Sequence, residues 1–240
     1  MRPKLAGKAG ILTMQLLLVA VGLLFWQWSA DNLVDELLIS RPTAVFQRVW
    51  TMTMSGALPA ALLSTVWSVA SGLFWGTLAG VAVGMLVALH KPTQAVLSPA
   101  IDVLFAIPKI ALVPLFVLWF GISYAERSVF TAVVVFFFLF YATMNGVARV
   151  PPALNVAFEL LGASHWQRVR LLYLPAALGW ITGGLRIATP YAFVAVVSAE
   201  VIGSRSGLGA LVHNSGVVLD TAGMFAGIVV TTLAAALSGG

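Results

Sequence analysis

Long apolar runs, separated by short polar stretches, dominate the chain. A helix that crosses about 30 Å of hydrocarbon needs roughly 20 apolar residues, because each residue advances the helix by about 1.5 Å. The pattern therefore predicts an all-α, polytopic membrane protein of about six transmembrane helices. The predicted spans are residues 11–28, 67–89, 96–120, 129–147, 178–202 and an apolar run that starts at residue 222.

Composition agrees with this prediction and narrows the function classes. Of the 240 residues, 60% are hydrophobic and 9% are charged, and the mean hydropathy is +1.01. A water-soluble domain with these values would expose large apolar patches. The spans leave no room for a soluble catalytic domain, and no paired carboxylates or nucleophile motif is visible, so we expect no enzyme activity.

The charged and metal-ligating residues indicate neither nucleic acid nor metal as a partner. The net charge is +5, but the basic residues lie between apolar runs instead of clustering on one polar face. Cysteine is absent, and His90, His165 and His213 lie far apart in sequence. We therefore expect no disulfide, no thiolate metal site and no histidine metal cluster.

The basic residues instead predict the orientation, because positive charges resist translocation across the membrane. With a cytoplasmic N-terminus, seven lysine and arginine residues lie inside and four lie outside. This orientation places residues 149–175 in the cytoplasm and the loop at 203–221 outside. The residues inside are Arg2, Lys4, Lys8, Lys91, Arg149, Arg168 and Arg170, and those outside are Arg41, Arg48, Arg127 and Arg205.

The two ends of the chain carry two further expectations. No small-residue cleavage site follows Trp26 and Trp28, so residues 1–30 are predicted to be a retained N-terminal transmembrane helix instead of a signal peptide. The last apolar run stops at Gly240 without a basic residue to anchor it, which suggests a truncated C-terminus. Residues 58–240 form the main transmembrane domain in this interpretation.

A glycine stripe marks the second predicted span. Gly72, Gly76, Gly80 and Gly84 recur every four residues and share one helix face. Such a stripe lets another backbone approach closely. The partner is either another helix of this chain or a second subunit.

The third predicted span, residues 96–120, contains Pro99, Pro108 and Pro114. Because proline removes a backbone donor and clashes with the preceding turn, this span should be broken or kinked. The freed carbonyl groups are tolerable only where protein or a watery cavity satisfies them. The break therefore serves either a transport pathway or simple kinked packing.

Four charged residues lie in or near predicted spans, where a lone charge costs at least about 2.5 kcal/mol. Asp102 and Lys109 are seven residues apart, two turns along one face, so they form either an ion pair or part of a solute pathway. Arg186 has either a structural role near the cytoplasmic side or a solute contact. Glu200 either faces an outer gate or accepts a hydrogen bond from the glycine-rich loop at 203–216.

The longest predicted cytoplasmic segment, residues 149–175, is amphipathic. Apolar residues recur at helical spacing from Val156 to Ala163, and Gly162 permits a sharp change of direction. A second short helical run should then end before Pro175. Two short helices along the membrane surface, rigidly continuous with the neighbouring spans, could transmit motion from a soluble partner.

This segment resembles the cytoplasmic coupling loop of binding-protein-dependent ABC importer permeases. That loop has a Glu-Ala-Ala start, a glycine six positions after the glutamate, and a later Leu-Pro. The glutamate position falls on Val156, followed by Ala157, and whether Glu159 takes over its contact with the ATPase is left open. The remaining positions that match the loop are Gly162, Ala163, Ser164, Trp166, Gln167, Leu174, Pro175 and Ala176.

Other stretches resemble the permeases for nitrate, sulfonates, taurine and vitamin precursors, including thiamine-pyrimidine and riboflavin-type compounds. They are IPKIALVPLFVLWFGIS at 107–123, GLRIA within 183–188, VSAEVIGSRSGLG ending at Gly209, and DTAGMFAGIVV at 220–230. Together they extend the resemblance over residues 58–238. The resemblance implies the transmembrane permease subunit of an ATP-binding-cassette importer, which moves a small solute across the bacterial cytoplasmic (inner) membrane.

The resemblance also implies the partners of the chain. Two copies of the permease would form a homodimer that pairs with separate ABC ATPase subunits, which carry ATP and Mg, and with a periplasmic or extracellular solute-binding protein. The chain contains no G-x-x-x-x-G-K-[ST] phosphate loop, so we expect no cofactor on it. The competing hypothesis is a secondary transporter or channel without an ATPase partner, which predicts repeated spans and mid-membrane coupling charges.

Overall fold

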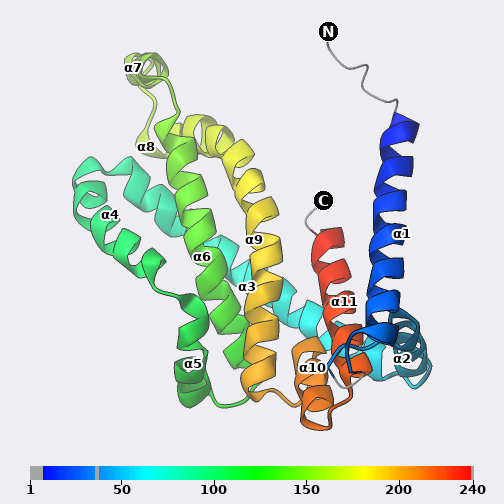
Figure 1. Cartoon of the computed structure of the whole chain (residues 1–240). Helices are drawn as coiled ribbons and strands as arrows, with labels where there is room; N and C mark the ends of the chain where they lie inside the picture. Colours follow the sequence, from blue (N-terminus) through cyan, green and yellow to red (C-terminus); the bar gives the residue numbers. More distant parts are fainter. Residues whose placement is uncertain (1–7, 36–37, 239–240) are drawn as a thin grey trace. The chain divides into compact units, whose positions relative to one another are not determined.

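The computed structural model describes residues 8–35 and 38–238, and every regular element in this part of the chain is helical (Figure 1). Arg2, Lys4 and Gly240, on which sequence-based expectations rest, lie outside the described residues. The helices are α1 (Lys8–Asn32), α2 (Pro42–Met54), α3 (Ala57–Leu89), α4 (Lys91–Ala106), the 3₁₀ helix η1 (Lys109–Leu112), α5 (Val113–Phe120), α6 (Tyr124–Ala148), α7 (Pro152–Leu160), α8 (His165–Arg168), the π-helix η2 (Val169–Tyr173), α9 (Leu174–Gly203), α10 (Leu208–Val217) and α11 (Thr221–Ser238).

The predicted all-α membrane architecture is confirmed. Among the described residues, five stretches are long and apolar enough to cross a membrane, and a bent helix pair, α4 with η1 and α5, makes a sixth if it counts as one span. The five stretches are Gly10–Asn32, Ala57–Leu89, Tyr124–Ala148, His165–Val217 and Thr221–Ser238.

Two boundaries differ from the sequence-based expectation. The second predicted span, residues 67–89, is part of a longer helix, α3, which begins at Ala57. Pro59 is tolerated in it because it lies in the first turn, where backbone N–H groups have no partner inside the helix. The prediction of a loop over residues 203–216 is wrong for most of this range. The loop is short, because α10 begins at Leu208. Gly209 belongs to this helix, and a side chain there would collide with the Val197 carbonyl oxygen, so the glycine serves close packing.

Packing divides the chain into two units: residues 1–59 with 211–229, and residues 60–210 with 230–240. In the first unit, Arg48 of α2 donates hydrogen bonds from Nε and Nη2 to Asp220 Oδ2, at 2.9 and 2.5 Å. Trp26 of α1 packs on Phe225 of α11, with ring centroids 5.3 Å apart. These contacts join helices that are distant in sequence.

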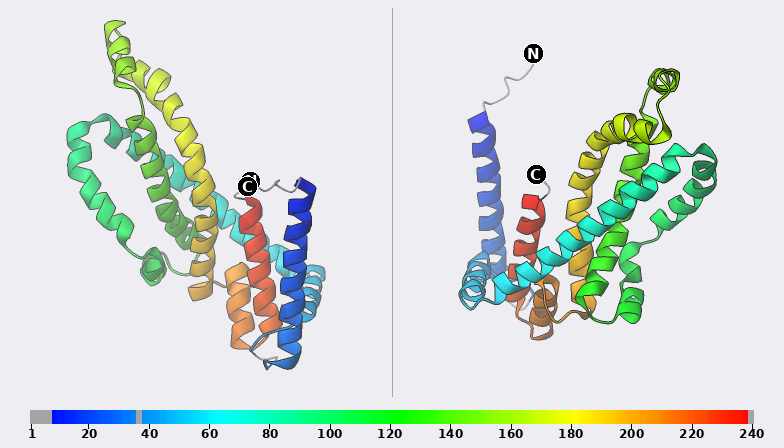
Figure 2. Two further views of the ribbon diagram at one scale, coloured as in Figure 1. Left: turned by 45° about the horizontal axis from the view of Figure 1, so that its top comes forward. Right: turned by 180° about the vertical axis from the view of Figure 1, so that it is seen from behind.

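The second unit is built around α6 and α9, which lie side by side in all views (Figures 1 and 2). Val135 and Leu139 of α6 are fully buried in the same cluster as Ala188 and Ala192 of α9. Small alanine side chains on α9 let the two helix axes come close, so that the larger side chains of α6 fill the space between them.

The glycine stripe of α3 packs against α6 within the chain. A Cβ atom at Gly76 would lie 2.6 Å from the carbonyl oxygen of Ala132, and one at Gly80 would lie 2.6 Å from that of Phe136. Gly84 and Gly72 meet the backbone or side chains of α6 in the same way. Of the two alternatives left open by the sequence, the structure therefore supports an intrachain partner.

Gly76→Ala is expected to lower the free energy of unfolding by about 1–3 kcal/mol, because the added methyl group must push α3 away from α6. Thermal unfolding in detergent micelles, followed by tryptophan fluorescence, measures the effect. Gly22→Ala in α1 is the matched control, since no atom lies within 4 Å of the Cβ position there. Equal unfolding temperatures for the two variants would contradict the close packing.

The proline-rich span is broken, as predicted. Its two parts, Lys91–Ala106 and Lys109–Phe120, are bent by 82°. At the break, Ile107 has extended backbone angles, φ −61° and ψ 130°, because the ring of the following Pro108 disfavours helical geometry. Pro114 falls in the first turn of α5, where its missing N–H group costs no helical hydrogen bond.

Helix α8 runs through η2 into α9 without an intervening loop. The expectation that the second short helix ends before Pro175 is therefore wrong. A proline inside a helix deprives the carbonyl group four residues earlier, here that of Leu171, of its donor. The π-helical turn over Val169–Tyr173 widens the helix directly before Pro175 and accommodates its ring, so the helix continues.

Candidate functional site

The segment between α6 and α9 contains a sharp, hydrogen-bonded turn at Gly162. Gly162 has φ +72°, a left-handed conformation that a residue with a side chain adopts only with strain. The Gly162 N–H group donates to Glu159 O and the Ala163 N–H group donates to Phe158 O, both at 3.0 Å. These two bonds satisfy carbonyl groups at the end of α7, as in a Schellman motif, and give the turn one defined geometry.

The next helix, α8, begins with a reciprocal cap. The Ser164 hydroxyl accepts from the Gln167 N–H group at 3.3 Å, and the Gln167 side chain accepts from the Ser164 N–H group at 2.7 Å. Glu159 of α7 forms an ion pair with Arg168 of α8, with Oε1 and Nη1 2.6 Å apart. The Glu159 carboxylate is therefore engaged within the segment and holds α7 and α8 together across the turn.

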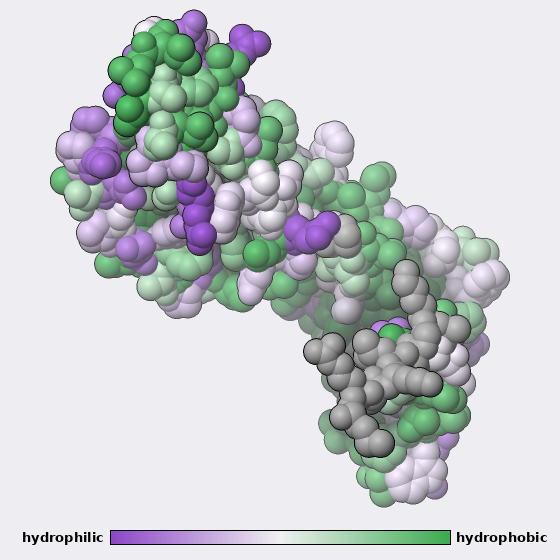
Figure 3. Space-filling model, turned by 90° about the horizontal axis from the view of Figure 1, so that it is seen from above, coloured by the Kyte–Doolittle hydropathy of each residue, from purple (hydrophilic) through white to green (hydrophobic). Residues whose placement is uncertain are grey.

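Apolar side chains of this segment are exposed. Leu160 and Leu161 are 84% and 82% exposed, and Trp166 of α8 is 69% exposed. Val156, at the position of the family glutamate, is also exposed. In Figure 3, hydrophobic residues gather over α7 and hydrophilic residues border them. We call Val156, Leu160, Leu161 and Trp166 the coupling patch.

The other residues assigned to coupling lie at defined places in the same element. Ala157 is exposed on α7, and Ala163 is half-buried directly after the turn. Leu174 and Pro175 are exposed in the first turn of α9, directly after η2. Together with Val156, Glu159, Gly162, Ser164 and Trp166, these residues lie in one continuous stretch of the chain from α7 to the start of α9.

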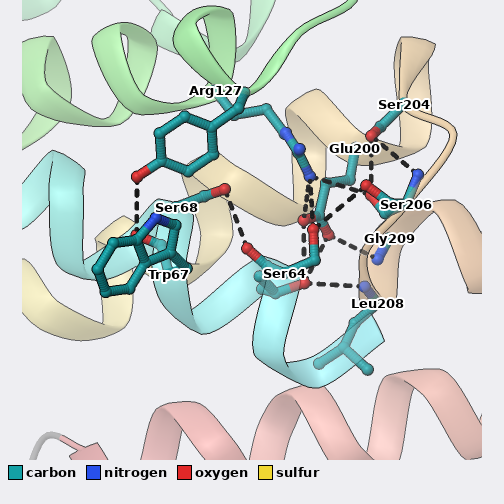
Figure 4. A network of polar contacts seen from close by, with 11 residues as sticks. Ser64, Trp67, Ser68, Arg127, Glu200, Ser204, Ser206, Leu208 and Gly209 are labelled. Carbon is teal, nitrogen blue, oxygen red and sulfur yellow. Dashed lines mark hydrogen bonds and ion pairs between the residues drawn. The ribbon is translucent and has the colours of Figure 1, made fainter. Parts of the chain in front are cut away.

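A second polar site surrounds Glu200, which is fully buried near the end of α9 (Figure 4). Its carboxylate accepts hydrogen bonds from the Thr65 hydroxyl at 2.9 Å, from Arg127 Nη1 at 3.1 Å and from the Gly209 N–H group at 2.9 Å. The donor Gly209 lies within the range 203–216 that the sequence named, but it belongs to the first turn of α10 instead of a loop. Gly207 is required here, because its φ is +113° and a side chain would collide with the carboxylate.

Sequence reasoning missed the partners of Glu200. Arg127 Nη1 also donates to Ser206 O at 3.0 Å, and Thr65 Oγ1 accepts from the Leu208 N–H group at 2.8 Å. The network thus joins α3, α6 and α9 to the loop before α10. Arg127, a basic residue beside an apolar run, indicated that a buried partner should exist. The sequence could not identify this partner, because Glu200 lies 73 residues away.

Asp102 and Lys109 are not an ion pair in the described structure. Asp102 Oδ1 accepts a 2.5 Å hydrogen bond from the Tyr141 hydroxyl of α6. Lys109 Nζ donates to Phe105 O at 2.6 Å and lies 4.3 and 4.9 Å from the ring centroids of Phe105 and Phe137. The break at residues 107–108 takes the two side chains off the common helix face that the spacing of seven predicted.

Arg186 lies in the middle of α9 and is exposed. It neighbours Ile187 and lies one turn from Gly183, both of which line a pocket of about 500 Å³ between α6 and α9. Phe138 of α6 lines this pocket and also a second one, of about 360 Å³, that contains Lys109 and Tyr191. The larger pocket thus lies between α6 and α9, and the adjoining smaller one lies between these helices and the broken span.

Comparison with known proteins agrees with this architecture. The taurine transport system permease protein of Escherichia coli is 30% identical over 218 residues, which cover 89% of this chain and 79% of that protein. The riboflavin transport system permease protein of Chloroflexus aurantiacus is 28% identical over 223 residues, which cover 92% and 81%. An inward-facing structure of the MetNI methionine ABC transporter shares the fold, with a TM-score of 0.65, 21% identity, and coverage of 78% of this chain and 93% of that one.

The family comparison covers most of the chain. The model of the family described as "Binding-protein-dependent transport system inner membrane component" matches residues 72–239. This range includes the glycine stripe, the broken span, the segment with the coupling patch, and all members of the Glu200 network except Thr65. The chain belongs to the family of binding-protein-dependent transport system inner membrane components.

Proposed function

We propose that this chain is the membrane-spanning subunit of an ATP-binding-cassette importer that moves a small solute, of the nitrate, sulfonate, taurine or vitamin-precursor type, across the bacterial inner membrane. The observation that carries the proposal is the coupling patch. Leu160, Leu161 and Trp166 are exposed apolar side chains on a turn whose geometry is set by Gly162 and by the Glu159–Arg168 ion pair. Leu160 and Leu161 lie outside the stretches that could cross a membrane, and exposed apolar residues at such a place are typical of a protein interface.

The coupling patch is continuous with the transmembrane helices. Helix α8 leads through η2 directly into α9, which lines both adjoining pockets together with α6. A partner that binds the patch and moves it would therefore displace α9 and change the access to the pockets. Alternating access requires a protein to switch between two discrete arrangements, and a displacement of α9 would produce such a switch.

The partners and the orientation belong to the same proposal. ATP and Mg are bound by separate ATPase subunits that contact the coupling patch, and a periplasmic or extracellular solute-binding protein delivers the solute on the opposite side. The N-terminus and residues 149–175 are cytoplasmic, and two copies of the chain form a homodimer. The charge distribution and the location of the patch support this arrangement.

Reconstitution tests the proposal. Vesicles that contain this chain, its ATPase and its binding protein should accumulate taurine or riboflavin, the solutes named for two relatives, only when ATP is supplied. The matched control is the same complex with the phosphate-loop lysine of the ATPase replaced, which should lose uptake without losing assembly. Uptake by this chain alone, in vesicles without ATP, would instead indicate a secondary transporter or channel and overturn the proposal.

A further inference from the structure

The smaller of the two adjoining pockets contains one positive charge among apolar and aromatic walls. It has a volume of about 360 Å³ and lies where the broken span faces α6 and α9. The lining includes the rings of Phe105, Phe138 and Tyr191. Lys109 is the one charged residue of the described lining, and the Tyr191 hydroxyl is its other polar side-chain group.

The charge of Lys109 is only partly compensated within the described part of the chain. Its ammonium group has three donors, and the structure supplies one acceptor, Phe105 O. The faces of Phe105 and Phe137 add a weak cation–π attraction. No carboxylate among residues 8–35 and 38–238 forms an ion pair with Lys109, and Asp102 is engaged by Tyr141. A cation at membrane depth without a counter-charge is costly, which favours an anionic occupant.

We propose that this pocket binds the transported solute, and that the solute is a small organic anion. Its sulfonate, carboxylate or phosphate group accepts hydrogen bonds from Lys109 Nζ, and its apolar part lies against Phe105, Phe138 and Tyr191. This inference rests on the proposed importer function and names the chemical class of its solute.

The larger pocket gives the anion a route towards the N-terminal end of α9, which is joined through η2 to α8 and its coupling-patch residue Trp166. The two pockets share Phe138, and the larger one continues along α9 past Gly183 and Gly179 to Ala176. No other atom lies within 4 Å of a Cβ position at Gly179 or Gly183, so these glycines face open space. Arg149, stacked 5.2 Å from the ring of Trp180, places a second positive charge beside this route.

Uptake by variants of Lys109 tests the inference in the full complex. Vesicles of phosphatidylcholine that contain the permease, its ATPase and its binding protein are supplied with ethanesulfonate or with riboflavin, and ATP-dependent uptake is measured. Lys109→Met should lower ethanesulfonate uptake about tenfold or more, because a charged hydrogen bond to the solute is lost. Lys109→Arg should retain most uptake, and Lys91→Met, which removes an exposed lysine at the start of α4, is the matched control.

The outcomes separate this inference from the importer proposal. ATP-dependent uptake of riboflavin alone, or of ethanesulfonate with equal rates for wild type and Lys109→Met, would overturn the anion site and leave the importer function standing. Uptake without ATP would overturn the importer function instead. An effect of Lys109→Met that occurs only in vesicles with added phosphatidylglycerol would mean that the pocket holds a lipid headgroup, which also contradicts a solute site.

A labelling experiment on the unaltered complex covers the case in which Lys109→Met does not fold. Pyridoxal 5′-phosphate, an anionic aldehyde, forms an imine with accessible lysine amines, which borohydride reduces to a stable product that peptide mass spectrometry detects. Ethanesulfonate should reduce the labelling of Lys109 and leave that of Lys91 unchanged. Equal labelling of Lys109 with and without ethanesulfonate would overturn the inference.

Discussion

Glu200→Ala is expected to lower the free energy of unfolding by about 3–5 kcal/mol, because it removes one partner of a buried ion pair. The Glu200 side chain is completely buried, and that of Arg127 is 7% exposed. Without the carboxylate, the Arg127 guanidinium, the Thr65 hydroxyl and the Gly209 N–H group lose an acceptor in surroundings that contain little water. Thermal or dodecyl-sulfate unfolding in micelles, followed by tryptophan fluorescence, measures the loss.

Two further variants control this measurement. The double variant Glu200→Ala with Arg127→Met should be more stable than Glu200→Ala alone, because it no longer buries an unpaired charge. Glu159→Ala removes the carboxylate of an ion pair whose side chains are 62% and 23% exposed, and should cost less than about 1 kcal/mol. Similar losses for Glu200→Ala and Glu159→Ala would show that burial does not set the strength of the Glu200 network.

Leu160→Ala combined with Leu161→Ala is expected to weaken ATPase binding at least about thirtyfold, if each leucine contributes as a typical interface anchor of 1 kcal/mol or more. Both side chains are more than four-fifths exposed, so their truncation should leave the unfolding temperature unchanged. Titration of the detergent-solubilised permease with labelled ATPase measures the affinity, and ATP-dependent uptake should fall in parallel.

Leu237→Ala is the matched control for the coupling patch. Leu237 is 84% exposed, as Leu160 is, but it lies near the end of α11. This variant should bind the ATPase with the affinity of the wild type. Unchanged ATPase binding after the double substitution in the coupling patch would remove the observation on which the proposed function depends.

The spans could be predicted because their signal is local. Each apolar run is close to or above the roughly 20 residues that a bilayer requires. A proline such as Pro108 acts on its own backbone and on the residue before it. The turn at Gly162 was also predictable, because glycine is the residue that adopts a left-handed conformation without strain. These features depend on a few consecutive residues.

The features that were missed depend on contacts between distant residues. The ion pair of Glu200 with Arg127 and the packing of the glycine stripe on α6 both require the tertiary arrangement of helices. On an unbroken helix, the spacing of seven residues would place Asp102 and Lys109 on the same face. The 82° bend between the two helices separates the side chains, so no ion pair forms between them. Pro175 indicated a helix end, but the π-helical turn before it relieved the clash and let the helix continue.

The uninterrupted helical path from His165 to Gly203 has a mechanical consequence. At 1.5 Å per residue this path is about 58 Å long when it is followed along the helix, which changes direction between α8 and α9 (Figure 1), and it contains no loop that could absorb a displacement. Its stiffness is lowest at η2 and at Pro190, where regular backbone hydrogen bonds are missing. A displacement applied at Trp166 would therefore be carried into α9, and the helix would bend most easily at Pro190, which is next in sequence to Tyr191 of the smaller pocket.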